Sequence, residues 1–315
     1  MAHKISVILP FHRIDALLKQ AIDSCLGSSN VELELLLINT TSIDERFSDQ
    51  PVKVFHKPGY NYIEALRFGL TQASHDAIGL MNSDDLIDSS RFYRQVDKLY
   101  SEQSDICLCW MQKIDMKERE LPSLTGKLPF YDFHPSFLLL GPIGADATWV
   151  FKKEWATSHS LFADALDSSD FAVALRVLPK SKVCVVPEYL YLYRTHNSQV
   201  TSRRIMPKPT HELGLLADLN LQLGLPTLTF DQHLAMAFSN LRKGHLGDLK
   251  RLREWIEAMM TLNTQNQLYL KNSLISLIRR RILIATWYKL GYWDSKKSLL
   301  HFVRDLLVLN RNVKR

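Results

Sequence analysis

The chain of 315 residues carries 39 Lys and Arg, 33 Asp and Glu, a formal net charge of +6, and 46% hydrophobic residues. This is the composition of a soluble globular protein, long enough for one large domain or two smaller ones, and it excludes the low-complexity classes. Residues 271–315 contain 11 Lys and Arg against two acidic residues, so the whole positive excess lies in this tail. The near-neutral remainder does not have the charge of a nucleic-acid-binding core, and we expect no nucleic-acid partner.

Cysteine usage and the start of the chain indicate a cytoplasmic protein. The cysteines Cys25, Cys107, Cys109 and Cys184 show no CxxC spacing, and we expect all of them to be reduced core residues. The N-terminus enters a strand-like run at residue 5 without a signal-peptide hydrophobic region, and no apolar run reaches the length of a membrane span. We therefore expect a cytoplasmic protein, attached at most peripherally to the inner face of the cell membrane.

Strand-like and helix-like patterns alternate along the first hundred residues. Strands are expected at residues 5–9, 33–38, 52–55 and 78–81, and Pro10 is expected to end the first of them. Apolar residues three or four positions apart predict amphipathic helices over 14–26 and 62–73, with Gly27 ending the first helix. This alternation predicts an α/β fold with a mostly parallel sheet flanked by helices.

Three polar segments, residues 10–13, 39–44 and 82–85, follow strands of this predicted sheet. Ligands bind beyond the carboxyl ends of the strands in such sheets, so we expect the three segments at one binding edge. The third segment holds two adjacent carboxylates, Asp84 and Asp85, which repel each other unless a cation or hydrogen-bond donors lie nearby. One interpretation is an Mg²⁺ or Mn²⁺ site that holds a diphosphate. The other is a solvated turn that leads into the next helix.

The alternation continues to about residue 202 and then changes character. After a helix over 89–101, strands are expected at 105–110, 148–151 and 183–186, with an exposed excursion over 112–127 and a helix over 171–178. From residue 203 onward, helical periodicity replaces strand alternation. We therefore place a domain boundary near Ser202. The α/β domain spans 1–202, with halves at 1–105 and 106–202, and a mainly α-helical region with the basic tail spans 203–315.

Four short motifs of this chain occur in the same order in a known family. Residues 6–13 (Ser-Val-Ile-Leu-Pro-Phe-His-Arg) are similar to its first strand and nucleotide-contacting turn, and residues 82–85 (Asn-Ser-Asp-Asp) to its DxD metal motif. Residues 169–170 (Ser-Asp) resemble its ED motif, which supplies a catalytic base. Residues 193–196 (Tyr-Arg-Thr-His) with Thr201 resemble its YRxH…S segment, which closes the site. Over about residues 4–202 the chain thus resembles the inverting glycosyltransferases of family 2, which have the GT-A fold (a Rossmann-like α/β architecture).

The chain departs from the family pattern at acidic positions. The aspartate pair that usually follows the second strand is Asn39-Thr40 here. The Asn39 amide oxygen is still able to accept from the N3–H of uracil, without the charge assistance of a carboxylate, so the resemblance implies UDP, held loosely. The first acid of the metal motif is Asn82, which leaves Asp84 as the better-supported ligand and Asp85 as its neighbour. The base motif has Ser169 where Glu is usual. Asp170 therefore carries the base assignment alone.

The resemblance implies a complete site. Asp170 is the catalytic base, and Asp84, Asp85 and His196 hold a divalent metal, Mn²⁺ or Mg²⁺. The donor nucleotide contacts Pro10, Phe11, His12, Arg13, Asn39, Thr41, Arg67, Asn82, Ser83 and Asp84. The implied reaction transfers a sugar from a UDP-sugar, with inversion, to a hydroxyl of a saccharide or lipid-linked saccharide in bacterial-type surface polysaccharide or glycolipid assembly. His196, Arg67 and Arg194 are equally consistent with solvated surface side chains.

Other interpretations stay open. A nucleotidyltransferase would show a Gly-rich basic loop after the first strand and a Rossmann dehydrogenase a G-x-G-x-x-G motif, but residues 10–15 contain no glycine. Asn39, Thr40, Asn82 and Ser169 stand at positions where the family usually has an acidic residue. A catalytically degenerate domain that acts as a scaffold or binding module therefore stays possible as an alternative. The basic amphipathic stretches 274–288 and 298–309 are suited to an anionic membrane surface, at about 1 kcal/mol per basic residue. A packed helical subdomain or a homodimer interface is the alternative for them.

Overall fold

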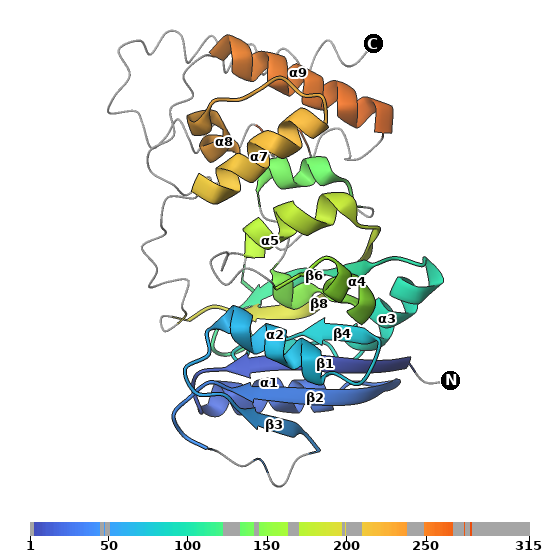
Figure 1. Cartoon of the computed structure of the whole chain (residues 1–315), viewed down its shortest axis with the longest axis vertical. Helices are drawn as coiled ribbons and strands as arrows, with labels where there is room; N and C mark the ends of the chain where they lie inside the picture. The colour runs from blue at the N-terminus through green and yellow to red at the C-terminus, as the bar shows by residue number, and fades with distance from the viewer. Residues whose placement is uncertain are drawn as a thin grey trace. The chain divides into compact units, whose positions relative to one another are not determined.

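The computed structural model describes residues 3–44, 47, 51–121, 133–141, 145–162, 170–196, 199, 210–237, 249–266, 274 and 278 (Figure 1). The chain separates into two compact units. Met1–Phe133 and Pro142–Pro209 form the first, and His134–Gly141 and Thr210–Arg315 form the second. The division falls after Pro209, and His134–Gly141 groups with the C-terminal unit. The boundary near Ser202 stays a prediction.

The first unit is built on a sheet whose eight described strands lie in the order β3-β2-β1-β4-β7-β6-β8-β5. The strands are β1 (His3–Phe11), β2 (Val31–Asn39), β3 (Lys53–His56), β4 (Ala77–Leu80), β5 (Leu86–Ile87), β6 (Ile106–Ile114), β7 (Val150–Lys152) and β8 (Val183–Arg194). The β1–β2, β2–β3, β1–β4 and β6–β8 pairs are parallel. Strand β7 runs antiparallel to β4 and β6, and β5 antiparallel to β8. The predicted α/β fold of GT-A type is confirmed, with a mixed sheet.

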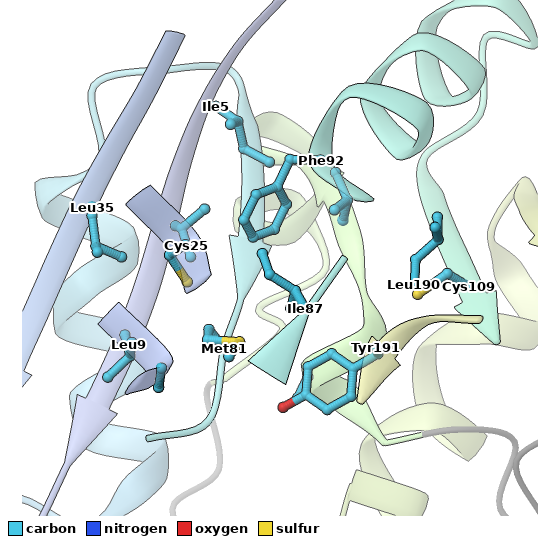
Figure 2. Close-up of a cluster of buried hydrophobic side chains, with 14 of the residues drawn as sticks. Ile5, Leu9, Cys25, Leu35, Met81, Ile87, Phe92, Cys109, Leu190 and Tyr191 are labelled. Atoms are coloured by element: carbon cyan, nitrogen blue, oxygen red, sulfur yellow. The ribbon is translucent and has the colours of Figure 1, made fainter. Parts of the chain in front are cut away.

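Helices cover both faces of this sheet. The helices of the first unit are α1 (Ala16–Leu26), α2 (Tyr62–Gln72), α3 (Arg91–Ser101), α4 (Lys153–Ser158) and α5 (Asp170–Val177), with short 3-10 helices η2 (Asp146–Thr148) and η3 (Leu178–Lys180). Side chains of α1 and α3 share a buried cluster with alternate residues of β1, such as Ile5 and Leu9 (Figure 2). Helix α2 lies on the opposite face, where a Cβ atom on Gly69 would stand 2.4 Å from Cγ2 of Ile8. Glycine therefore allows α2 to approach the sheet closely.

The structure differs from the sequence prediction at several strand ends. Strand β1 continues through Pro10 to Phe11, because beyond Ile8 it pairs with β2 alone, and a proline is tolerated where one side of a strand has no partner. Strand β6 reaches Ile114, into the predicted excursion, because β8 accompanies it along one uninterrupted strand to Arg194. Strand β5 and helix α4 are too short to leave a periodic pattern in the sequence.

The second unit is helical, as the periodicity predicts. Its described elements are η1 (Pro135–Leu140), α7 (Thr210–Gln222), α8 (Phe230–Ala237) and α9 (Leu249–Asn266). Trp255 of α9 is fully buried and donates from Nε1 to Oδ1 of Asn220 at 2.6 Å, which ties α9 to α7. Among the described helices, none has the length and apolar character needed to cross a membrane. The predicted amphipathic stretches of the basic tail lie outside the described residues, apart from Leu274 and Ile278.

A buried carboxylate joins β2 to its neighbours. Glu34 accepts hydrogen bonds from Nζ of Lys53 at 2.5 Å, from the N–H and hydroxyl of Ser74 at 2.9 and 2.6 Å, and from the hydroxyl of Ser6. Burial alone would raise the pKa of Glu34, but these bonds outweigh it and lower the pKa to about 2. A carboxyl whose pKa is depressed on folding stabilises the fold above its unfolded pKa, near 4.5, and loses that contribution as the pH falls toward 2.

We predict that Glu34→Gln lowers the free energy of unfolding by about 2 kcal/mol near neutral pH, because charge-assisted hydrogen bonds to a buried carboxylate are replaced by neutral ones. Between pH 4.5 and 2 the difference from wild type should shrink as the wild-type carboxylate is protonated. Urea unfolding at several pH values measures both effects. Glu32→Gln, on the same strand but exposed, is the matched control. A constant difference across this pH range would contradict the assigned role of the charge.

Candidate functional site

The carboxyl ends of β1, β2 and β4 lie side by side, as the parallel sheet predicts. The N–H of Thr40, after β2, donates to the carbonyl of Phe11 at 2.9 Å. The N–H of Met81, after β4, donates to the carbonyl of Ile8 at 3.1 Å. The end of β8 joins them, because the N–H of Arg194 donates to Oδ1 of Asp85 at 2.8 Å. All three polar segments therefore belong to one edge of the sheet.

Asp85 is an anchor inside this edge. It is fully buried, and its Oδ2 accepts from the hydroxyl of Tyr191 at 2.6 Å and from Nδ2 of Asn82 at 3.1 Å. Burial, and next the negative charge of Asp84, raise the pKa of Asp85 to about 7, although the bonds from Tyr191, Arg194 and Asn82 counteract this rise. Both carboxylate oxygens of Asp85 are thus engaged within the protein, and Asp85 connects β4 to β8.

Arg91 supports the anchor from α3. It is fully buried, and its guanidinium carbon lies 4.9 Å from the ring centroid of Tyr191. Its Nη2 donates to the carbonyls of Ala147 at 2.5 Å and Leu80 at 3.3 Å. A cation over an aromatic face is attracted by the ring's electrons. Arg91 therefore fixes the end of β4, the ring of Tyr191 and the segment after Asp146 with one side chain.

Asp84, in contrast, is accessible. Its side chain is 33% exposed, and its Oδ2 lies 3.1 Å from Nε2 of His196, whose side chain is 7% exposed. Among the described residues, no three or more His, Cys, Asp and Glu side chains are grouped to hold a metal ion, so the predicted set Asp84, Asp85 and His196 is not brought together as three ligands. Mg²⁺ and similar ions are usually bound by one or two carboxylates, waters and substrate phosphates. Asp84, with His196 beside it, fits that mode of binding.

Arg194 is not a solvated side chain. It is 1% exposed, and its Nε donates to the carbonyl of Asp84 at 3.1 Å. Its own carbonyl accepts from Nε2 of Gln199 at 2.6 Å. Arg194 therefore shapes the acidic turn and the segment that carries His196, and the solvated alternative for Arg194 is wrong.

The predicted nucleotide contacts on β1 differ in accessibility. Pro10 and Phe11 are buried in the strand, whereas His12 is exposed and Arg13 half-buried. Partial burial and then the nearby charge of Arg13 lower the pKa of His12, and the negative charges of Asp84 and Asp15 oppose this shift. The electrostatic influence of Asp84 on His12 is consistent with their positions on one edge. The roles of these residues in donor binding stay predictions.

The Asn39 amide is already used within its own loop. Asn39 is fully buried, its Oδ1 accepts from the N–H and hydroxyl of Thr41 at 2.9 and 2.7 Å, and its Nδ2 donates to the carbonyl of Ile43 at 2.7 Å. The uracil contact predicted for Asn39 would require these bonds to break. Thr41 is half-buried beside it, and its carbonyl lies 3.0 Å from Nε2 of His56. The neutral amide shapes this loop where a charged pair is usual.

Arg67 and Ser83 complete the predicted contacts. Arg67 is exposed on α2, and its Nε and Nη2 both donate to the carbonyl of Phe162, at 2.8 and 2.5 Å. Ser83 is half-buried in the turn between Asn82 and Asp84. The position of Arg67 thus includes a structural contact that the sequence did not predict, and a phosphate contact from either residue stays a prediction.

Asp170, the predicted base, lies in the neighbourhood of a buried acid, Asp146, that the sequence analysis did not identify. Asp170 begins α5 and is half-buried. Burial, and next the nearby negative charge of Asp170, raise the pKa of Asp146 well above its usual range. Asp146 is 6% exposed and accepts from the hydroxyl of Tyr62 at 3.1 Å. That hydroxyl also lies 3.4 Å from Oδ1 of Asn82, so Tyr62 lies between the acidic turn and Asp146. Asp146 belongs to no recognised motif. The available signal in the sequence was that Asp146 is a single acidic residue within a mainly apolar run.

Residues 6–158 match the family described as Glycosyl transferase family 2, and this part of the chain is therefore a glycosyltransferase family 2 domain. The chain is 26% identical over 117 residues to the uncharacterized glycosyltransferase EpsJ of Bacillus subtilis, a match over 35% of this chain and 34% of that protein. It is 33% identical over 102 residues to an uncharacterized glycosyltransferase of Haemophilus influenzae, over 30% of this chain and 41% of that protein. The chain thus spans well under half of each of these two relatives.

A longer match joins the chain to the O-antigen biosynthesis glycosyltransferase WbnJ of Escherichia coli, with 24% identity over 210 residues, 61% of this chain and 80% of that protein. Among solved structures, residues 1–349 of S. aureus TarS in complex with UDP-GlcNAc superpose with a TM-score of 0.57 and 14% identity. That match covers 98% of this chain and 92% of the TarS chain. At this identity the likeness establishes the fold.

Proposed function

We propose that this protein is an inverting, metal-dependent glycosyltransferase that moves a sugar from a UDP-sugar to a hydroxyl of a saccharide acceptor. The observation that carries the proposal is the position of acidic side chains around one edge of the sheet. The accessible Asp84 lies against His196, and Asp146 is linked to the same turn through the hydroxyl of Tyr62. Burial, and next the negative charges of Asp146 and Asp170, raise the pKa of Tyr62. Bound UDP-GlcNAc and UDP in the structurally similar TarS support a UDP-sugar as the donor.

The two acidic groups have different tasks in this proposal. Asp84 and His196 would hold Mn²⁺ or Mg²⁺, which when bound stabilises the charge of the leaving diphosphate. Asp170 takes the proton of the acceptor hydroxyl as its oxygen attacks the anomeric carbon from the face opposite the diphosphate, which inverts the configuration. Asp85, Tyr191 and Arg194 hold the acidic turn in place.

For the acceptor we propose only a chemical class, and for the enzyme's location only a type of surface. The relation to WbnJ, named for O-antigen biosynthesis, supports a saccharide or lipid-linked saccharide acceptor in the assembly of a bacterial-type surface polysaccharide. The basic tail over residues 271–315 would place such an enzyme at an anionic membrane surface. Flotation with anionic liposomes at low and high salt tests this contact, and protein that stays at the bottom of the gradient at low salt would exclude it.

A thermal-shift panel tests the donor and the metal together. UDP, GDP, CMP and their common sugar conjugates are each added with Mn²⁺ and with EDTA. A ligand at about 100 times its Kd adds about 2.7 kcal/mol to stability, enough to raise Tm by a few degrees in a chain of this size. We expect a shift with UDP ligands that EDTA removes. The absence of a shift with every nucleotide would instead favour the non-catalytic binding module.

A further inference from the structure

Asn82, the first residue of the acidic turn 82–85, is held at both ends of its side-chain amide. Its Nδ2 donates to Oδ2 of Asp85 at 3.1 Å, and its Oδ1 accepts from the hydroxyl of Tyr62 at 3.4 Å. Its backbone N–H donates to the hydroxyl of Tyr191, also at 3.4 Å. Both ends of the amide that the sequence predicted to contact the donor nucleotide are thus engaged within the protein.

The bond from Asn82 to Asp85 closes the acidic turn across its two ends. Asp85 is fully buried and accepts two further hydrogen bonds from β8, at 2.6 and 2.8 Å, so Asn82 is tied to a residue that is itself held in place. Asp84 lies between the two ends and stays accessible, with its Oδ2 3.1 Å from Nε2 of His196. The closed turn therefore sets the position from which Asp84 faces His196.

Tyr62 supports the other end of the amide. It is the first residue of α2, whose N-terminus is fixed by a capping box. Its hydroxyl has one proton and faces two acceptors, Oδ2 of Asp146 at 3.1 Å and Oδ1 of Asn82 at 3.4 Å. The shorter contact is the stronger hydrogen bond. Tyr62 thus contributes less to the position of Asn82 than Asp85 does.

An aspartate at position 82 would not make the same link. A carboxylate has no hydrogen to donate to Asp85, and it would add a third negative charge to a turn that already carries Asp84 and Asp85. Two carboxylates that share a buried site resist double ionisation. The amide of Asn82 is therefore matched to the buried carboxylate beside it.

We propose that Asn82 is a positioning residue for Asp84 and not a donor contact: its amide closes the turn and directs the Asp84 carboxylate toward the metal site beside His196. This inference rests on the proposed function, in which Asp84 and His196 would hold Mn²⁺ or Mg²⁺. A variant that breaks the link to Asp85 should weaken binding of the metal. The loss of a donor contact would weaken binding of the nucleotide instead.

Isothermal titration calorimetry of the folded protein, well below Tm, separates the two roles when Mn²⁺ is titrated at saturating UDP. Asn82→Ala removes the link without adding charge and should raise the Kd for Mn²⁺ about fivefold. Asn82→Asp adds repulsion and should raise it more than about tenfold. A direct contact to UDP is made with and without the metal, so its loss would leave the Kd for Mn²⁺ at saturating UDP unchanged.

Asn30→Asp is the matched control, because it adds the same charge at an exposed position just before β2, at the other end of that strand from Asn39. It should leave the Kd for Mn²⁺ unchanged.

Tighter binding of Mn²⁺ in Asn82→Asp, or an unchanged Kd for Mn²⁺ in Asn82→Ala, would overturn the positioning role. A fall in Tm with unchanged binding of Mn²⁺ would likewise overturn it and leave Asn82 a structural role alone. Asn82→Ala decides by itself if Asn82→Asp does not fold. A wild-type protein that binds no UDP in the presence of Mn²⁺ would instead overturn the proposed function, on which this inference rests.

Discussion

Asp170→Asn should lower the rate of sugar transfer by about 10²–10⁴-fold, the usual contribution of a general base, while the fold and donor binding are preserved. The amide matches the carboxylate in shape and can still accept hydrogen bonds, so α5 should form as in wild type. It cannot take the proton of an acceptor hydroxyl near neutral pH. The measurement is kcat for transfer, or for UDP release to water, together with Tm and the UDP-induced thermal shift.

Asp97→Asn is the matched control for this change, because it removes an exposed carboxylate that contacts His3 at the start of β1, the opposite end of that strand from the predicted site. It should leave turnover unchanged. Near-wild-type turnover in Asp170→Asn would remove Asp170 from the base role and would move attention to other acidic residues. A large fall in Tm without a change in kcat would show that Asp170 serves the start of α5 instead.

The adjacent substitutions Asp84→Ala and Asp85→Ala should affect different properties: the first UDP binding, the second the stability of the fold. Asp84→Ala should abolish metal-dependent UDP binding and leave Tm near the wild-type value, because this carboxylate is accessible and its described side-chain contact is with the imidazole of His196. Asp85→Ala should lower the free energy of unfolding by about 3 kcal/mol, because it leaves the buried hydroxyl of Tyr191 and the N–H of Arg194 without their acceptor.

Thermal unfolding with and without UDP and Mn²⁺ measures both effects on the same samples. Asp88→Ala, a change in the segment just before α3, controls for the loss of any acidic side chain in this region. The assignment would be reversed if Asp85→Ala were stable but unable to bind UDP, and Asp84→Ala were destabilised but able to bind it. If EDTA has no effect on the wild type, the metal proposal fails before either variant is interpreted.

Local patterns in the sequence predicted the elements that periodicity marks. The strand-like run before Pro10 and the apolar stripe over residues 14–26 appear in the structure as β1 and α1. The convergence of the segments after β1, β2 and β4 followed from the parallel sheet, because parallel strands end at the same edge. Elements such as β5, with two residues, are held by tertiary pairing to β8 rather than by their own sequence.

The motifs likewise indicated the acidic turn and Asp170, and they favoured Asp84 over Asp85 as the metal ligand, but they did not show which side chains are buried. They assigned Asn39 to the nucleotide and left Arg194 open as a solvated side chain. The structure buries Asp85 and Arg194, engages both ends of the Asn39 amide, and buries Asp146 under the hydroxyl of Tyr62. Each of these differences changes which side chain can meet a substrate.

The sequence by itself determined the fold class, the shared edge of the sheet and the residue types available there. The tertiary structure decided which acid is accessible, which is an anchor and which is buried against a tyrosine hydroxyl. The physical reason is that burial and hydrogen-bond partners depend on residues distant in the chain. The bond from Tyr191 to Asp85 spans 106 positions and that from Tyr62 to Asp146 spans 84. A carboxyl group becomes a ligand, a base or a structural anchor through the groups that surround it, and only the folded chain brings those groups together.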